Sequence, residues 1–114
     1  MVNKRNQPRR NTPHRINVLS ADDDRVLGRL VNITTGGLMF LSAEAFSRSQ
    51  MISLRVPLPT MTHNRSSIEL RAQVVWQGSD ANPNYTRVGV QFENVGAEEG
   101  FIIETVLQRL HLVG

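Results

Sequence analysis

Short stretches in which apolar and polar residues alternate recur from residue 16 onward, a pattern typical of half-buried antiparallel strands. The clearest covers residues 66–76, where every second position from Ile68 to Trp76 is apolar. A second covers residues 86–93, where Val88, Val90 and Phe92 alternate with polar or small residues. We expect these two strands to pair through the loop 78–85. On this pattern we interpret Trp76 as a core residue, with stacking on a ligand as the alternative.

Four weaker alternating stretches precede these two and bring the predicted number of strands to six. They cover residues 15–20, 26–33, 38–41 and 51–58. Three consecutive aspartates at 22–24 separate the first two stretches, and their short carboxylates suit a hairpin turn. A metal site there is disfavoured, because no further acid or histidine lies at ligand spacing.

The apolar spacing changes after Gly96 from every second residue to every third or fourth. This predicts an amphipathic helix within residues 97–112, with Glu98 and Glu99 suited to its first turn and Arg109 to its last. The expected apolar face comprises Phe101, Ile103, Val106, Leu107 and Leu110. The fold predicted from the pattern is therefore all-β, a six-stranded antiparallel β-barrel with a C-terminal α-helix closing one end.

Length and composition limit the classes of protein to consider. The 114 residues suffice for one domain, and no stretch approaches the roughly 20 apolar residues of a membrane-spanning helix. The first ten residues hold no apolar run typical of a secretory signal, so we expect a cytoplasmic protein. The absence of cysteine excludes disulfides, thiol catalysis and cysteine-ligated metal.

Positive charge is concentrated at the N-terminus. Residues 1–15 hold five basic and no acidic residues, whereas the remainder holds eight basic and ten acidic ones. Pro8 and Pro13 disfavour a helix or strand, so we predict a flexible basic arm at 1–14 and a barrel domain at 15–114. Such an arm is either a solvated tail or a binding segment for an anionic partner.

The turn from Asn32 to Gly37 is the best candidate binding element. Its paired glycines, Gly36 and Gly37, permit positive φ and let a ligand approach the backbone, while Asn32 and Thr34 can donate and accept hydrogen bonds. Alone, the segment also fits an ordinary hairpin turn. It becomes informative beside the arginines, because a guanidinium can bind phosphate, the edge of guanine or an aromatic plane.

This layout resembles the PilZ domain family, whose signature is RxxxR before the first strand and [D/N]xSxxG at a strand end. The segment from Asn32 to Gly37 matches the second motif in spacing, with Thr34 in the serine position, and the strands 70–76 and 87–92 resemble the family's late strands. The first motif departs from the pattern, because the position four residues before Arg15 holds Asn11 and Arg10 lies one residue farther away.

The resemblance implies a PilZ-type β-barrel that binds cyclic di-GMP. The ligand-binding residues that it implies are Arg9, Arg10, Arg15, Asn32, Thr34, Gly36 and Gly37, with Arg5 in reserve. It further implies a second-messenger receptor in the bacterial cytoplasm, a monomer or weak dimer, that changes its surface on binding and signals to a protein partner. A ligand-blind PilZ-like adaptor is the alternative.

Other classes of function are disfavoured by the sequence. Single-stranded nucleic-acid binding usually needs aromatic stacking platforms, and the chain has only six Phe, Trp and Tyr residues, so no DNA or RNA partner is expected. The three histidines are scattered and no nucleophile-elbow or phosphate-loop motif occurs, so neither a metal site, a cofactor nor an enzymatic activity is expected. Membrane insertion is not expected either.

Overall fold

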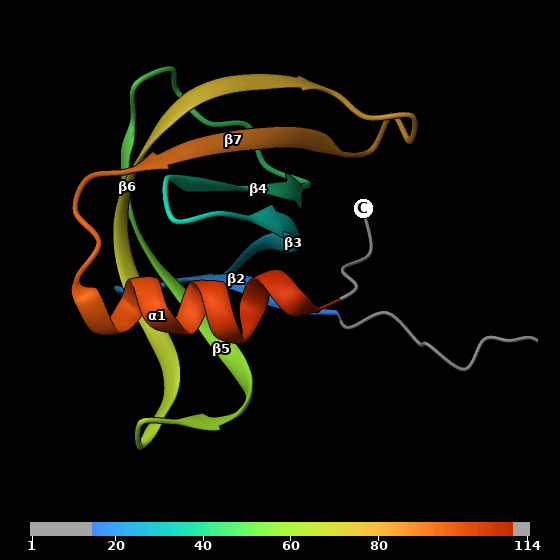
Figure 1. The fold of residues 1–114 in the computed structure, drawn as a ribbon. Coiled ribbons are helices and arrows are strands. Elements are labelled where there is room, and N and C mark those ends of the chain that lie inside the picture. Colours follow the sequence, from blue (N-terminus) through green and yellow to red (C-terminus); the bar gives the residue numbers. More distant parts are fainter. Residues whose placement is uncertain (1–14, 111–114) are drawn as a thin grey trace, which may run out of the picture.

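A computed structural model describes residues 15–110 and shows six antiparallel strands that form a closed barrel in the order β2-β3-β4-β7-β6-β5 (Figure 1). The predicted six-stranded antiparallel barrel with a C-terminal helix is confirmed. The predicted arm, residues 1–14, lies outside the described residues. The strands are β2 (Asn17–Ser20), β3 (Val26–Ile33), β4 (Gly37–Ser42), β5 (Met51–Thr62), β6 (Arg65–Ser79) and β7 (Thr86–Phe92).

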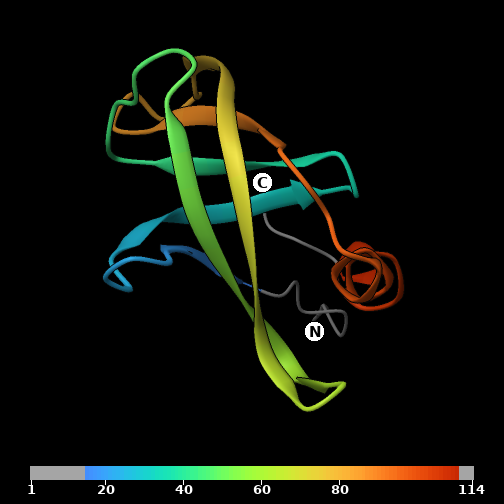
Figure 2. The ribbon, with the colours of Figure 1, turned by 90° about the vertical axis from the view of Figure 1, so that its left-hand side faces the viewer.

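The hairpin of β5 and β6 extends beyond the barrel, as Figure 2 shows at the bottom of the view. Both strands are longer than predicted, because β5 continues through Pro59 to Thr62 and β6 continues past Trp76 to Ser79. Their two-residue connection, His63 and Asn64, has positive φ at both positions, which matches the right-handed twist of a tight hairpin. The distal half of this hairpin therefore stands outside the barrel wall as a two-stranded ribbon.

The barrel interior is filled by the alternating apolar residues that the sequence pattern selects. In β6 the inward positions Ile68, Leu70, Ala72 and Val74 are each at most 4% exposed, as the alternation predicts. Every strand contributes to the same cluster, so the molecule has one core. Its most completely buried large side chains include Phe40, Leu30, Leu54, Ile102, Ile103 and Leu107.

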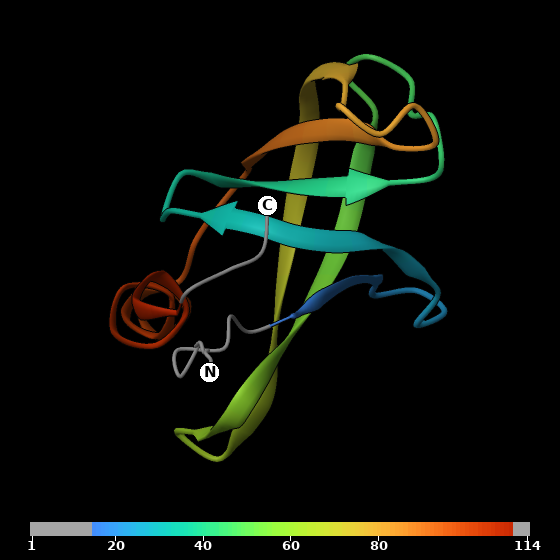
Figure 3. The same cartoon turned by 90° about the vertical axis from the view of Figure 1, so that its right-hand side faces the viewer.

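The helix α1 (Ala97–Thr105) and the 3₁₀ turn η1 (Leu107–Arg109) follow the last strand, and Figure 3 shows them end-on beside the barrel. The predicted apolar face is partly wrong. Phe101 is 51% exposed and packs its ring edge-to-face on His63 of the β5–β6 turn, whereas Ile102 is fully buried. Ile103 and Leu107 lie in the core and Val106 and Leu110 pack against it, as predicted, so Ile102 replaces Phe101 on the apolar face.

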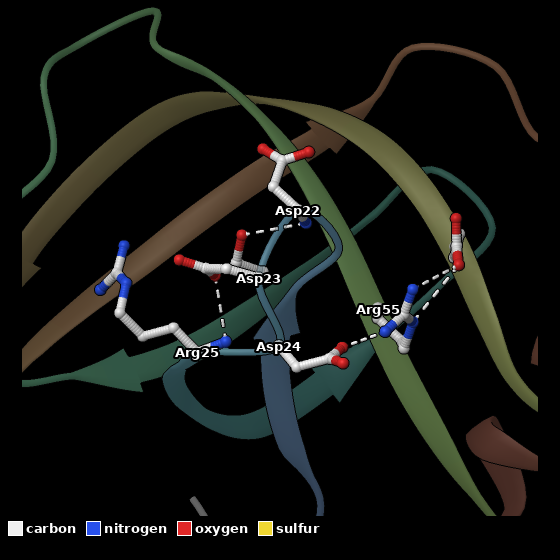
Figure 4. Close-up of polar contacts among 7 residues, drawn as sticks. Asp22, Asp23, Asp24, Arg25 and Arg55 are labelled. Atoms are coloured by element: carbon white, nitrogen blue, oxygen red, sulfur yellow. Dashed lines mark hydrogen bonds and ion pairs between the residues drawn. The ribbon is translucent and has the colours of Figure 1, made fainter.

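The aspartates at 22–24 form the predicted turn between β2 and β3 (Figure 4). The Asp23 carboxylate accepts the Arg25 backbone N–H at 3.1 Å, and this hydrogen bond lowers the pKa of Asp23. Asp24 has a φ of 60° and pairs with Arg55. Throughout residues 15–110, no group of three or more histidine or acidic side chains is arranged to hold a metal ion. Neither helical segment in that range is long and apolar enough to cross a membrane.

Candidate functional site

The turn between β3 and β4 is fixed by hydrogen bonds of its own residues. The Thr34 backbone N–H donates to the Gly37 carbonyl at 2.8 Å, and the Thr34 hydroxyl oxygen accepts the Gly36 N–H at 3.1 Å. The Gly36 carbonyl in turn accepts the Phe92 N–H of β7 at 2.9 Å. The Thr34 side chain therefore shapes the turn and is also exposed to solvent.

The two glycines of this turn have different roles, and neither has the expected positive φ. No glycine within residues 15–110 has positive φ, so the expectation of a left-handed turn glycine is wrong. Gly37 is required by close packing, since a Cβ there would lie 2.1 Å from the Val90 carbonyl oxygen of β7. A Cβ on Gly36 would meet only the Thr34 hydroxyl, at 3.7 Å, so this position leaves open space.

A cavity of about 230 Å³ lies between this turn and the neighbouring part of β6 and β7. It brings together three of the predicted site residues, Asn32, Thr34 and Gly37. Gly36 belongs to the turn but does not line the cavity. The remaining wall comes from β4, β6 and β7 and consists of Leu38, Met39, Val75, Trp76, Gly89 and Val90.

Trp76 is the site residue that the sequence pattern misassigned. The side chain is 46% exposed, because the register of β6 against β7 shifts between Val74 and Trp76 and both Val75 and Trp76 face outward. The indole lies on Gly89, where a Cβ would be 2.3 Å from its Nε1. The interpretation of Trp76 as a core residue is therefore wrong. Gly89 within an otherwise apolar strand could have indicated this close approach.

Asn32 lies between this cavity and a second one of about 410 Å³, whose wall includes Ile33 and the 3₁₀ turn η1. The Gln108 side-chain amide donates to the Ile33 carbonyl at 3.3 Å and links η1 to the end of β3. The exposed Asn32 amide can therefore reach a ligand in either cavity, with donors and acceptors on one side chain.

The basic residues of the predicted site are only partly described. Arg15 is exposed and immediately precedes Ile16, whose carbonyl accepts the Leu30 N–H at 2.8 Å, so Arg15 lies alongside the half of β3 that leads to Asn32. It lines neither cavity. Arg9 and Arg10, and the reserve Arg5, fall outside the described residues.

Arg71 of β6 and Arg87 of β7, which line neither cavity, each form an ion pair. Arg71 lies 3.3 Å from Glu93, and Arg87 lies 3.1 Å from Asp80. Hydrogen bonds from the Asn82 backbone and from Arg87 lower the pKa of Asp80, so this pair is charged at neutral pH. Both arginines point to the polar faces of their strands, as the alternation predicts.

Comparison with known proteins adds two findings. The family model described as "PilZ domain" matches residues 3–110. The solved structure titled "Structure of Bacillus subtilis Inhibitor of motility (MotI/DgrA)" superposes with a TM-score of 0.62 at 20% identity, over 88% of this chain and 49% of that one. The chain thus spans about half the length of that protein and shares its fold. No curated protein matches this chain in sequence.

The family match also bears on activity. PilZ domains are non-enzymatic receptor domains, a family that typically binds cyclic di-GMP, and the prediction that this chain is not an enzyme is confirmed on that basis. The closed six-stranded barrel, the turn from Asn32 to Gly37 and the match over nearly the whole sequence agree with one another. This chain belongs to the PilZ domain family.

Proposed function

We propose that this protein is a cyclic di-GMP receptor and that the nucleotide binds on the face formed by Asn32, Thr34 and Trp76. The observation that carries the proposal is the cavity that places an exposed indole plane beside the polar side chains of the β3–β4 turn. An aromatic plane and a hydrogen-bonding amide are the groups that recognise a purine by its face and its edge.

The size of the cavity indicates how much of the ligand it takes. About 230 Å³ is below the roughly 300 to 1,000 Å³ of pockets that enclose a drug-sized ligand. We therefore assign one guanine to this cavity, stacked on Trp76, with Asn32 at its edge. In this proposal the phosphates and the second guanine are bound by Arg9, Arg10 and Arg15, because a planar guanidinium can hydrogen-bond a phosphate and can also bind a guanine.

In this proposal the basic arm joins the site when the ligand binds, and the rearranged surface is what a protein partner recognises. The ligand-blind adaptor remains the second candidate, and Asn11 at the strict RxxxR position is the observation that favours it. Losing one charge-assisted hydrogen bond to a phosphate lowers affinity by about tenfold to a hundredfold. The two candidates therefore differ in a measurable affinity.

Calorimetric titration with cyclic di-GMP tests the proposal. Arg10→Ala, Arg15→Ala and Asn32→Ala should each weaken binding, the arginine variants by about one to two orders of magnitude. Arg48→Ala is the matched control, because Arg48 is exposed in the loop before β5 and lines none of the cavities described. It should bind like the wild type.

Two outcomes would replace the receptor. Absence of binding by the wild type at about 1 mM ligand, equivalent to roughly −4 kcal/mol, would leave the adaptor. Equal, strongly salt-dependent losses in all arginine variants, Arg48→Ala included, would indicate diffuse attraction of polyanions such as single-stranded nucleic acid.

A further inference from the structure

The largest of the cavities described lies away from the proposed nucleotide site. It has a volume of about 530 Å³ and shares no lining residue with the two cavities beside Asn32. It is bounded by the first half of β3, by the end of β4 and by the β6–β7 loop. The residues used below are Asn17, Val26, Arg29, Leu41, Asn82 and Tyr85.

Arg29 lines this cavity from the middle of three neighbouring strands. Asn17 of β2 and Leu41 of β4 are its register partners on the two sides, so the three residues form one row across the strands. The Arg29 Nε is buried and has no hydrogen-bond partner among the residues that the structure describes. Arg29 as a whole is only half-buried and lines the cavity, so its guanidinium is open to a ligand through the outer Nη groups.

The acidic groups around the cavity do not supply an acceptor for Arg29. Glu44, which lines it, is paired with Arg25. Asp80, next to the lining loop, binds Arg87 at 3.1 Å. Within residues 15–110, Arg29 forms no ion pair, and it is the one basic residue that lines this cavity.

The other walls indicate the kind of molecule that would provide the acceptor. Tyr85 is 43% exposed and Val26 is 51% exposed, and Leu41 adds a further apolar surface. The volume lies in the range of pockets that bind small organic ligands, which combine apolar walls with few polar groups. The side-chain amides of Asn17 and Asn82 add polar groups at the wall.

We propose that this cavity is a second ligand site, specific for a small organic monocarboxylate. The carboxylate accepts two parallel hydrogen bonds from the two Nη groups of the Arg29 guanidinium, and the apolar body packs on Tyr85 and Val26. A monoanion is preferred because a single guanidinium is uncompensated there, whereas a phosphate dianion would need further positive charge. This site does not depend on the proposed cyclic di-GMP site.

Benzoate is a suitable probe, because it pairs one carboxylate with one apolar ring, and benzamide is its neutral counterpart of nearly the same shape. In ¹H–¹⁵N NMR titrations of the whole protein, the Arg29 Nε–Hε resonance should shift saturably with benzoate at millimolar concentrations and not with benzamide. Arg29→Gln should weaken benzoate binding by roughly tenfold or more. Arg48→Gln removes an exposed arginine outside the cavity and should leave benzoate binding unchanged.

Three results would overturn the proposal. Equal binding of benzoate and benzamide to the wild type would show that the carboxylate is not recognised, and this comparison holds whether or not Arg29→Gln folds. Equal loss in Arg29→Gln and Arg48→Gln would show a general charge effect. A cyclic di-GMP titration that shifts Arg29 Nε–Hε in step with the Trp76 indole resonance would assign the cavity to the nucleotide instead.

Discussion

Replacement of Gly89 by alanine tests the placement of Trp76 without removing any group of the proposed site. The new Cβ would lie 2.3 Å from the indole Nε1 and 2.4 Å from Cε2. Carbon and nitrogen atoms in ordinary contact are about 3.5 Å apart, so the ring must retreat by about 1.2 Å. Because the indole is 46% exposed, it can move outward without opening the core. We therefore expect a loss of stability below about 1 kcal/mol.

Gly89→Ala should weaken cyclic di-GMP binding more than it lowers the stability of the fold. A base stacked on an aromatic side chain is worth about 1 to 3 kcal/mol, so a displaced indole should weaken cyclic di-GMP binding by roughly 5-fold to 150-fold. Trp76→Ala should lower the affinity for cyclic di-GMP by a similar factor. Adding Gly89→Ala to Trp76→Ala should have little further effect on affinity, because the two substitutions remove the same contact.

Tryptophan fluorescence provides the assay, since the chain contains one tryptophan. The emission of Gly89→Ala should differ from that of the wild type, and titration with cyclic di-GMP should give the lower affinity. Gly78→Ala in β6 is the matched control, because no atom lies within 4 Å of a Cβ at that position. Unchanged emission and unchanged affinity in Gly89→Ala would refute the placement of the indole over β7.

Other predictions concern stability and its dependence on pH. Gly37→Ala should destabilise the fold by about 2 kcal/mol or more in urea denaturation, since its Cβ would collide with the backbone of β7. Gly36→Ala should cost little stability, and equal effects of the two substitutions would contradict the packing described. Arg65 contacts Glu98 at 2.8 Å and Glu99 at 2.6 Å, and Arg65→Ala should cost about 0.5 to 1 kcal/mol, with a loss that shrinks at high salt. The hydrogen bond from Arg65 lowers the pKa of Glu99, so the ion pair stabilises the fold fully above the ordinary glutamate pKa. This stabilisation is lost as the pH falls through the lowered pKa of Glu99. Urea denaturation at pH 7 and pH 3 should therefore show a smaller acid-induced loss of stability in Arg65→Ala than in the wild type.

The barrel could be predicted from the sequence because β6 alternates over a long run, although β3 is buried at three-residue steps, at Leu27, Leu30 and Ile33. Between Ile68 and Val74, every second residue of β6 points into the core. The same counting fails at Trp76, because the bulge inserts one residue and reverses the parity of all that follow. A bulge depends on contacts with the neighbouring strand, and these cannot be deduced from the alternating strand alone.

The candidate site divides in a similar way. Asn32, Thr34 and Gly37 lie within six residues of one turn, so their spacing alone brings them to one cavity. Trp76 joins them from a strand on the far side of β7, through the pairing order of the sheet. The roles of Gly36 and Gly37 could not be predicted from the sequence either, because close strand packing and positive φ both call for the same residue type.

The ribbon of β5 and β6 beyond the barrel has a consequence for behaviour at high protein concentration. In the barrel wall each strand lies between two others, which leaves no open backbone to pair with a second molecule. The distal ribbon lacks such neighbours, and backbone N–H and C=O groups on its outer sides are open to intermolecular pairing. Pro57 and Pro59 remove two N–H donors from β5, and Arg65 ties the base of the turn to the helix. These features counteract edge-to-edge aggregation where the closed barrel itself offers no protection.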